Sequence, residues 1–322
     1  MTKSSLISKS MLALALLSAT SIFTATANAA DKGWPEQITV GYQKYGSLII
    51  LKGTGELEKR FKEHGVTVNW AEFQFGPPLL EAINAGKVDI GIVGETPPVF
   101  AQAAAGSSIV YVANEPASPK GEGIVVGPNS PIKSVSELKG KKVAVAKGSN
   151  SHYFLIKALE KEGLTLNDII PTYLPPADGR AALEQGHVDA WSIFDYFYAS
   201  AEVQANVRTL TNGEGIVNNH AFYISRKPIV EQYPEAVKAV VAEVGKTDAW
   251  ISANPAAGAA SLSAQTGVDA KILLRAIERS NYGPKPLTPE VITAQQKIAD
   301  TIHGLGLIPT PIIVKDNVWD GK

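Results

Sequence analysis

The chain has 322 residues, enough for two domains of ordinary size, and 45% of them are hydrophobic, so it can bury a substantial core. Lys and Arg number 30 against 31 Asp and Glu, which excludes the basic excess typical of general nucleic-acid binding. There is no cysteine, and this excludes disulfides, thiolate metal sites and cysteine nucleophiles.

The N-terminus has the pattern of an export signal. Lys3 and Lys9 precede an apolar run at 11–17, and Ala27-Asn28-Ala29 forms a small-residue cleavage site. A membrane anchor would need about 18 apolar residues, and Ser18 ends this run early. We therefore predict a signal peptide over residues 1–29 and an exported mature protein; an uncleaved amphipathic helix is the alternative.

Short strands and helices then alternate along the first half of the chain. Apolar runs and glycine stops predict a strand at 38–41, a helix at 47–59, a strand at 67–73, a Pro-Pro loop at 77–78, a helix at 79–86 and a strand at 90–93. Glu95 follows the last of these strands. Strands that alternate with helices predict a parallel sheet covered on both faces.

The same order returns 100 residues later. A strand at 142–146, a helix at 152–162, a strand at 169–174, Pro175-Pro176 and a strand at 190–193 repeat the pattern. Gly86 and Gly186 end equivalent helices, and Glu95 and Asp195 follow equivalent strands. The G-x-V-D match alone could arise by chance, but the aligned elements together predict two similar α/β lobes.

Turn-rich segments mark where the chain crosses between these lobes. Residues 114–121 suit one crossing and residues 215–220 a return crossing. We predict a first lobe of residues 30–114 plus 221–322 and a second lobe of residues 115–220. Val237, Val240, Val241 and Val244 form one helical face, and we expect further helices at 269–280 and 289–303 to pack onto the first lobe.

An ordered set of segments carries a family resemblance. These segments are GYQKYG at 41–46, GETPPVFAQ at 94–102, KGSN at 147–150, LPPAD at 174–178 and GLGLIP at 304–309. Over residues 36–320 the chain resembles the periplasmic aliphatic-sulfonate-binding proteins of ABC importers.

The resemblance implies an α/β protein with a two-lobed, type II periplasmic-binding-protein fold, in which a ligand cleft lies between two parallel-core α/β domains that close about a hinge. It further implies a periplasmic monomer without cofactor that captures an aliphatic sulfonate for sulfur supply. The ligand would be delivered to a separate ABC permease and ATPase. Relatives of this fold bind taurine or nitrate, so these ligands remain alternatives.

Loops at the ends of the first strands supply the candidate anion ligands. In open parallel sheets, ligands lie beyond the carboxyl ends of strands, where helix starts offer unpaired amides. Gly148, Ser149 and Asn150 open one such helix, although Ser149 or Asn150 could simply cap it. After the first strand, Gln43 can donate to sulfonate oxygens, and Lys44 supplies charge unless it is solvated at the rim.

The remaining candidates are aromatic or acidic. Tyr45 and Trp191 could wall the organic tail, or could belong to the core. Glu95 and Asp195 would repel an anion unless they cap helices or accept hydrogen bonds from an amino or hydroxyl group on the ligand. Thr96 is a further donor or a cap.

Three further residues have equally open roles. Arg180 is either a second cation for the ligand or the partner of Asp178 or Glu184. His152 and His220 lie close to the predicted cleft and could contact ligand or be structural.

No catalytic pattern is present in the sequence. It contains neither a G-x-S-x-G elbow, nor a phosphate loop, nor an H-E-x-x-H zinc motif, and its five histidines are scattered. We therefore predict a binding protein and no metal site; a hydrolase or another periplasmic enzyme on the same fold is the alternative class.

Overall fold

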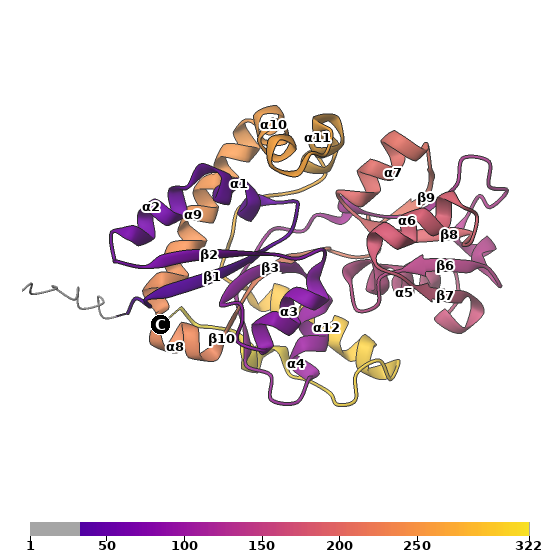
Figure 1. The fold of residues 1–322 in the computed structure, drawn as a ribbon. Coiled ribbons are helices and arrows are strands. Elements are labelled where there is room, and N and C mark those ends of the chain that lie inside the picture. The colour runs from indigo at the N-terminus through magenta and orange to yellow at the C-terminus, as the bar shows by residue number, and fades with distance from the viewer. Residues whose placement is uncertain (1–32, 322) are drawn as a thin grey trace, which may run out of the picture.

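The structure is a computed structural model that describes residues 33–321. It contains two five-stranded sheets that lie side by side, each covered by helices (Figure 1). The predicted signal peptide lies outside the described residues. Within residues 33–321, no helix combines the length and apolar character needed to cross a membrane.

The first sheet combines four strands from the N-terminal part of the chain with one that returns later. Its order is β2-β1-β3-β10-β4. The strands are β1 (Gln37–Tyr42), β2 (Thr67–Glu72), β3 (Ile90–Gly94), β4 (Ile109–Asn114) and β10 (Ala221–Arg226). β1 pairs in parallel with β2 and β3, whereas β10 runs antiparallel to both β3 and β4.

The second sheet repeats this arrangement with a continuous segment. Its order is β7-β6-β8-β5-β9. The strands are β5 (Glu122–Val126), β6 (Lys142–Val145), β7 (Ile170–Tyr173), β8 (Ala190–Phe194) and β9 (Arg208–Asn212). The two predicted α/β lobes with parallel cores are thus confirmed. Each sheet adds one antiparallel strand, β10 or β5, because that strand enters directly from the other lobe at the cleft side.

Helices cover both sheets. Around the first sheet lie α1 (Ser47–Thr54), α2 (Glu56–Lys62), α3 (Gly76–Asn84) and α4 (Pro97–Ala103), and around the second lie α5 (Asn150–Lys161), α6 (Pro176–Glu184) and α7 (Phe197–Ala205). The helix predicted at 47–59 is two helices, because Gly55 adopts a left-handed φ of 70° between them. Gly86 and Gly186 end helical segments with φ of 70° and 72°, as predicted.

The C-terminal part is helical. It comprises α8 (Lys227–Gln232), α9 (Pro234–Ala253), α10 (Pro255–Thr266), α11 (Ala270–Ile277) and α12 (Pro289–Gly304). Val237, Val240 and Val244 of α9 are fully buried in the core of the first lobe, and Val241 is partly buried against it, which confirms the predicted face. As expected, α11 packs onto the first lobe through Leu273 and Ile277. It also contacts the second lobe, because its Ile272 and Ala276 pack against Ala199 of α7.

The crossings between the sheets run from β4 to β5 and from β9 to β10. The division of the chain at 114/115 and 220/221 remains our proposal for the domain boundaries. It is supported by the strand membership, because every strand of the second sheet lies between those two positions.

Candidate functional site

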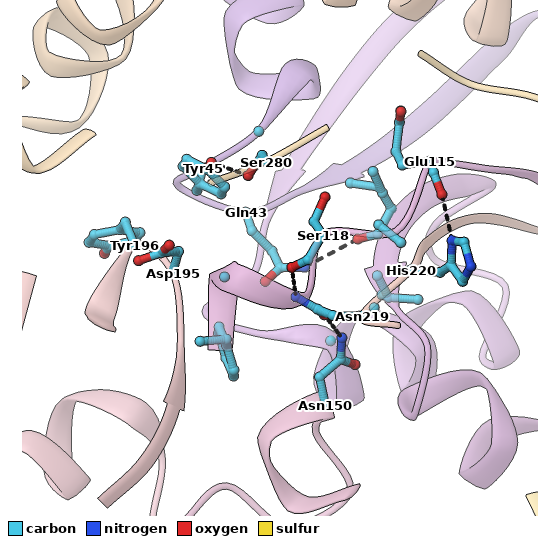
Figure 2. A pocket seen from close by; sticks show the side chains of 18 of the residues that line it. Gln43, Tyr45, Glu115, Ser118, Asn150, Asp195, Tyr196, Asn219, His220 and Ser280 are labelled. Atoms are coloured by element: carbon cyan, nitrogen blue, oxygen red, sulfur yellow. Dashed lines mark hydrogen bonds between the residues drawn. The ribbon is translucent and has the colours of Figure 1, made fainter. Parts of the chain in front are cut away.

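A cavity of about 180 Å³ lies between the two sheets, where strand ends from both lobes meet the crossings. Figure 2 shows its polar side chains from close by: Asp195 and Tyr196 lie on one side, and Glu115 and His220 on the other. The lining includes Gln43–Ser47 after β1, Gly94 of β3, Ser149 and Asn150, Phe194–Phe197 from the end of β8 onward, Ser118, Asn219 and Ser280–Tyr282.

Six of the ten predicted site residues line this cavity. They are Gln43, Lys44, Tyr45, Ser149, Asn150 and Asp195. The lining does not include Glu95, Thr96, Gly148 or Trp191. The geometry of each residue explains the difference.

Gln43 and Lys44 differ although they are neighbours. The Gln43 side-chain amide donates to the Ile92 carbonyl oxygen at 3.2 Å, so the end of β3 fixes its orientation. Lys44 Nζ lies 3.5 Å from Glu72 Oε1, and its side chain is 46% exposed. The Lys44 charge is therefore largely balanced by Glu72 at the rim of the cavity. This is the solvated rim position that the sequence left open as the alternative.

Tyr45 forms part of a tyrosine wall. Its hydroxyl lies 2.7 Å from Ser280 Oγ and 3.2 Å from the Tyr282 hydroxyl. Burial raises the pKa of Tyr45 well above its usual value, so it stays neutral. Tyr196 packs against the same small apolar cluster as Tyr45, and it stacks on Phe197 at 4.5 Å between ring centroids.

The start of α5 is tied to the protein itself. The Gly148 amide donates to His152 Nδ1 at 3.3 Å, and the Ser149 hydroxyl donates to the Ala146 carbonyl oxygen at 2.7 Å. Burial lowers the pKa of His152 to about 4, so its ring is neutral and Nδ1 can accept. The predicted donors Gly148 and Ser149 are therefore engaged inside the second lobe.

Asn150 joins the two lobes and a crossing. Its Nδ2 donates to Asn219 Oδ1 at 2.7 Å, and its Oδ1 accepts from the Thr96 amide at 3.2 Å. Asn219, whose φ is 52°, in turn donates to the Ser118 carbonyl oxygen at 2.9 Å. This amide chain connects both crossings across the cavity (Figure 2).

The capping role expected for Glu95 is wrong. Glu95 is 2% exposed, and its Oε2 accepts from the His220 amide at 2.9 Å because the return crossing passes beside the end of β3. Burial raises its pKa to about 7. Thr96 precedes α4 without capping it, and its buried hydroxyl oxygen has no partner among the described residues.

Asp195 fulfils the predicted cap. Its Oδ1 accepts from the Ala199 amide in the first turn of α7 at 2.9 Å, and Arg279 Nη1 of the segment after α11 lies 3.4 Å away. Its side chain is only 3% exposed, and burial raises its pKa to about 7. Oδ2 is buried without a partner among residues 33–321.

Trp191 and Arg180 lie away from the cavity. Trp191 is fully buried in the core of the second lobe, where Gly179 leaves room for its indole. The role of Trp191 as a wall of the ligand cleft is not supported by this placement. Arg180 Nε donates to Glu184 at 2.7 Å. This ion pair is one of the alternatives that the sequence left open for Arg180.

Sequence reasoning missed several lining residues. Ser118 and Asn219 lie in the predicted crossings, and their polar side chains beside turn-forming residues were a usable signal. Ser280 and Tyr282 follow α11, which has no counterpart in the repeat, so no local pattern places them at the cleft.

Comparison with known proteins decides the family. The profile of NMT1/THI5-like proteins matches residues 60–258. The chain belongs to the NMT1/THI5-like family. Over 311 residues it is 40% identical to a relative from Escherichia coli K12 that is named for the binding of aliphatic sulfonates, and the match covers 96% of this chain and 95% of that one.

Solved structures agree with this family. The alkanesulfonate-binding protein SsuA from Xanthomonas axonopodis pv. citri bound to MOPS is 37% identical, with a TM-score of 0.85 over 89% of this chain and 99% of that one. The periplasmic aliphatic sulphonate binding protein SsuA from Escherichia coli is 40% identical, with a TM-score of 0.81 over 89% and 92%. The desulfurization enzyme DSZB, at 14% identity, shares the fold alone.

Proposed function

We propose that this protein is a substrate-binding protein that captures aliphatic sulfonates in the cavity between its lobes. The observation that carries the proposal is a cavity where the strand ends of both lobes meet, whose lining includes neutral donors and tyrosines. It occurs in a chain that matches a MOPS-bound alkanesulfonate-binding protein at a TM-score of 0.85. A sulfonate is always ionised. Hydrogen-bond donors that are held in place and keep their protons therefore suit its oxygens.

The start of α1, together with Gln43, is the proposed place for the sulfonate oxygens. Gly46 precedes α1 without a side-chain cap, and the amides of Gly46, Ser47 and Leu48 lack an acceptor in the part of the chain that the structure describes. Gly46 and Ser47 line the cavity. Free amides at a helix start attract an anion. This support is stronger than that for Gly148–Asn150, because the Gly148 and Ser149 amides and the side chains of Ser149 and Asn150 already have protein partners.

Delivery requires further components. We infer that the chain is exported by its N-terminal signal, acts as a periplasmic monomer for sulfur supply, and hands its ligand to a separate ABC permease and ATPase. The Escherichia coli relative of known structure is periplasmic, and the sequence has no phosphate loop of its own. ATP turnover by the purified protein would contradict this division of labour.

Calorimetry with a ligand panel tests the function. The panel contains methane-, ethane- and propanesulfonate, taurine, nitrate and sulfate. Micromolar or tighter binding of alkanesulfonates with weak or absent binding of nitrate and sulfate supports the proposal. Nitrate as the tightest ligand, or no sulfonate binding at all, would overturn it.

A further inference from the structure

One carboxylate oxygen of the cavity wall has no hydrogen-bond partner within residues 33–321. Asp195 Oδ1 accepts from the Ala199 amide and faces Arg279, whereas Oδ2 is buried and unbonded among the described residues. An ionised carboxylate can only accept hydrogen bonds, so a buried oxygen in this state needs a donor. The side chain is 3% exposed and belongs to the cavity lining, so a bound ligand is in a position to supply that donor.

Space for such a donor exists beside Gly121. A Cβ placed on Gly121 would lie 3.9 Å from Asp195 Oδ2 and 3.3 Å from Asn219 Nδ2. The absence of a side chain at this lining position therefore leaves a gap between Asp195 and the return crossing. Asn219 Nδ2 is engaged with the Ser118 carbonyl oxygen, so within this gap Oδ2 is the acceptor that remains open.

The surrounding charges leave Asp195 less neutralised than its neighbour. Glu202 accepts from Arg275 Nε at 2.7 Å and also takes the closest contact of Arg279. The contact of Arg279 with Asp195 is longer, at 3.4 Å. The aromatic rings of Tyr45 and Tyr196 lie in the same wall, and such rings favour an adjacent cation.

We propose that Asp195 Oδ2 and the gap beside Gly121 form a subsite for a hydrogen-bond donor carried on the carbon chain of the ligand. The preferred substrates are then amino- and hydroxy-substituted alkanesulfonates rather than unsubstituted ones. This inference rests on the proposed function and specifies its substrate class. A site that is built to bond a ligand N–H or O–H disfavours the analogue that lacks it, because its own polar group is then left unpaired.

Calorimetry at two chain lengths tests the subsite. The panel pairs ethanesulfonate with its 2-amino and 2-hydroxy forms, and propanesulfonate with its 3-amino and 3-hydroxy forms. The protein should bind a substituted member of at least one set about tenfold more tightly than the unsubstituted member, and preference for the amine over the alcohol shows that charge contributes. Equal binding within both sets overturns the subsite, whereas no sulfonate binding overturns the proposed function itself.

Three variants locate the preference. Asp195→Asn keeps an oxygen to cap α7 but removes the charge, and Gly121→Ala fills the gap; each should reduce the substituted-to-unsubstituted affinity ratio to below threefold. Glu202→Gln is the matched control, because it perturbs the same arginines outside the cavity lining and should keep the ratio. If the Asp195→Asn protein unfolds below the assay temperature, the affinity ratio of Gly121→Ala alone tests the subsite. An unchanged ratio in Gly121→Ala and in any folded Asp195→Asn protein contradicts the inference.

Discussion

The two lobes repeat one order of strands and helices, yet they use equivalent positions differently. After the first strand of the first lobe, the first amides of α1 at the cavity have no acceptor among residues 33–321. After the first strand of the second lobe, the start of α5 is bonded to His152, Ala146 and the opposite lobe. One copy is suited to hold a ligand and the other to hold the lobes together.

The acids after the third strands diverge in the same way. Glu95 accepts from the return crossing and lies outside the cavity lining. Asp195 caps α7, and its other oxygen, in the cavity wall, is unbonded in the part of the chain that the structure describes. A repeat therefore predicts where functional positions lie, but the neighbours that each copy meets decide which chemistry it performs.

The largest expected effect separates the two helix starts. Gly46 has φ 91° and ψ −172°, a conformation that is essentially restricted to glycine, so Gly46→Ala should displace the first turn of α1. We expect sulfonate affinity to fall tenfold or more by calorimetry. Gly148→Ala, with φ 74° and ordinary contacts to Phe100, is the matched control and should cost less than threefold. The reverse order would place the anion at α5.

Asn150→Ala tests the role of α5 in closure. It removes the hydrogen bonds to Asn219 and to the Thr96 amide, so it should favour the open form and weaken sulfonate binding about fivefold. Small-angle scattering should show compaction of the parent protein at saturating sulfonate and a more expanded ligand-free variant. Asn69→Ala, which loses one exposed side-chain bond to Gln37, is the control. Equal affinity and equal scattering profiles for both variants would refute this role of Asn150 in closure.

The buried acids predict the pH dependence of stability. Burial raises the pKa values of Glu95 and Asp195 to about 7, so between about pH 4.5 and 7 the folded chain holds protons that the unfolded chain has released. The free energy of unfolding should therefore fall as the pH rises through this window, by at most about 1.4 kcal/mol per pH unit for each acid. Thermal melts from pH 5 to 8 measure this slope. Glu95→Gln should flatten it, and a midpoint that rises with pH would contradict the assignment.

Ser149→Ala tests whether the start of α5 binds the ligand or only stabilises the second lobe. From the sequence alone, this change would remove a sulfonate donor and cost about tenfold in affinity. In the structure the hydroxyl donates to Ala146, so the main loss should be about 1 kcal/mol of stability, with affinity reduced less than threefold. Calorimetry and thermal melting on the same preparation separate the two results. A tenfold loss of affinity without loss of stability would restore the direct role.

Lys44→Ala should have the smallest effect. The ammonium is half-exposed and pairs with Glu72, so sulfonate affinity should fall less than twofold. The remaining affinity should depend less on salt, because a screened charge has been removed. Titrations at low and high ionic strength check both points, and a loss above fivefold at low salt would show that Lys44 binds the anion directly.

Local patterns in the sequence predicted the repeated core of the two lobes. The order of its strands and helices, the helix stops at Gly86 and Gly186 and the buried face of α9 follow from periodicity and glycine conformation. Strand β9 and helix α10 were not predicted. The ends of parallel strands also located the cavity in general terms, through Gln43, Tyr45 and Asp195.

Contacts between distant segments decided what the sequence could not. Trp191 is buried because Gly179, on a neighbouring helix, leaves room for its ring. Arg279 contacts Asp195 because α11 packs against the second lobe, and no periodic pattern in the sequence predicts this contact. The roles of Ser149 and Glu95 likewise depend on Ala146 and on the return crossing, which lie beside them only in the folded chain.

The position of β10 has a consequence for the order in which the protein assembles. The second sheet uses strands from one continuous segment, so its pairings can form once residue 212 has left the ribosome, before β10 is available. In the first sheet, β10 lies between β3 and β4, and these strands have no hydrogen-bonded contact with each other. The first sheet therefore stays divided into two parts until residues 221–226 insert between β3 and β4 and pair with both. A chain that stops before these residues would expose the facing edges of β3 and β4.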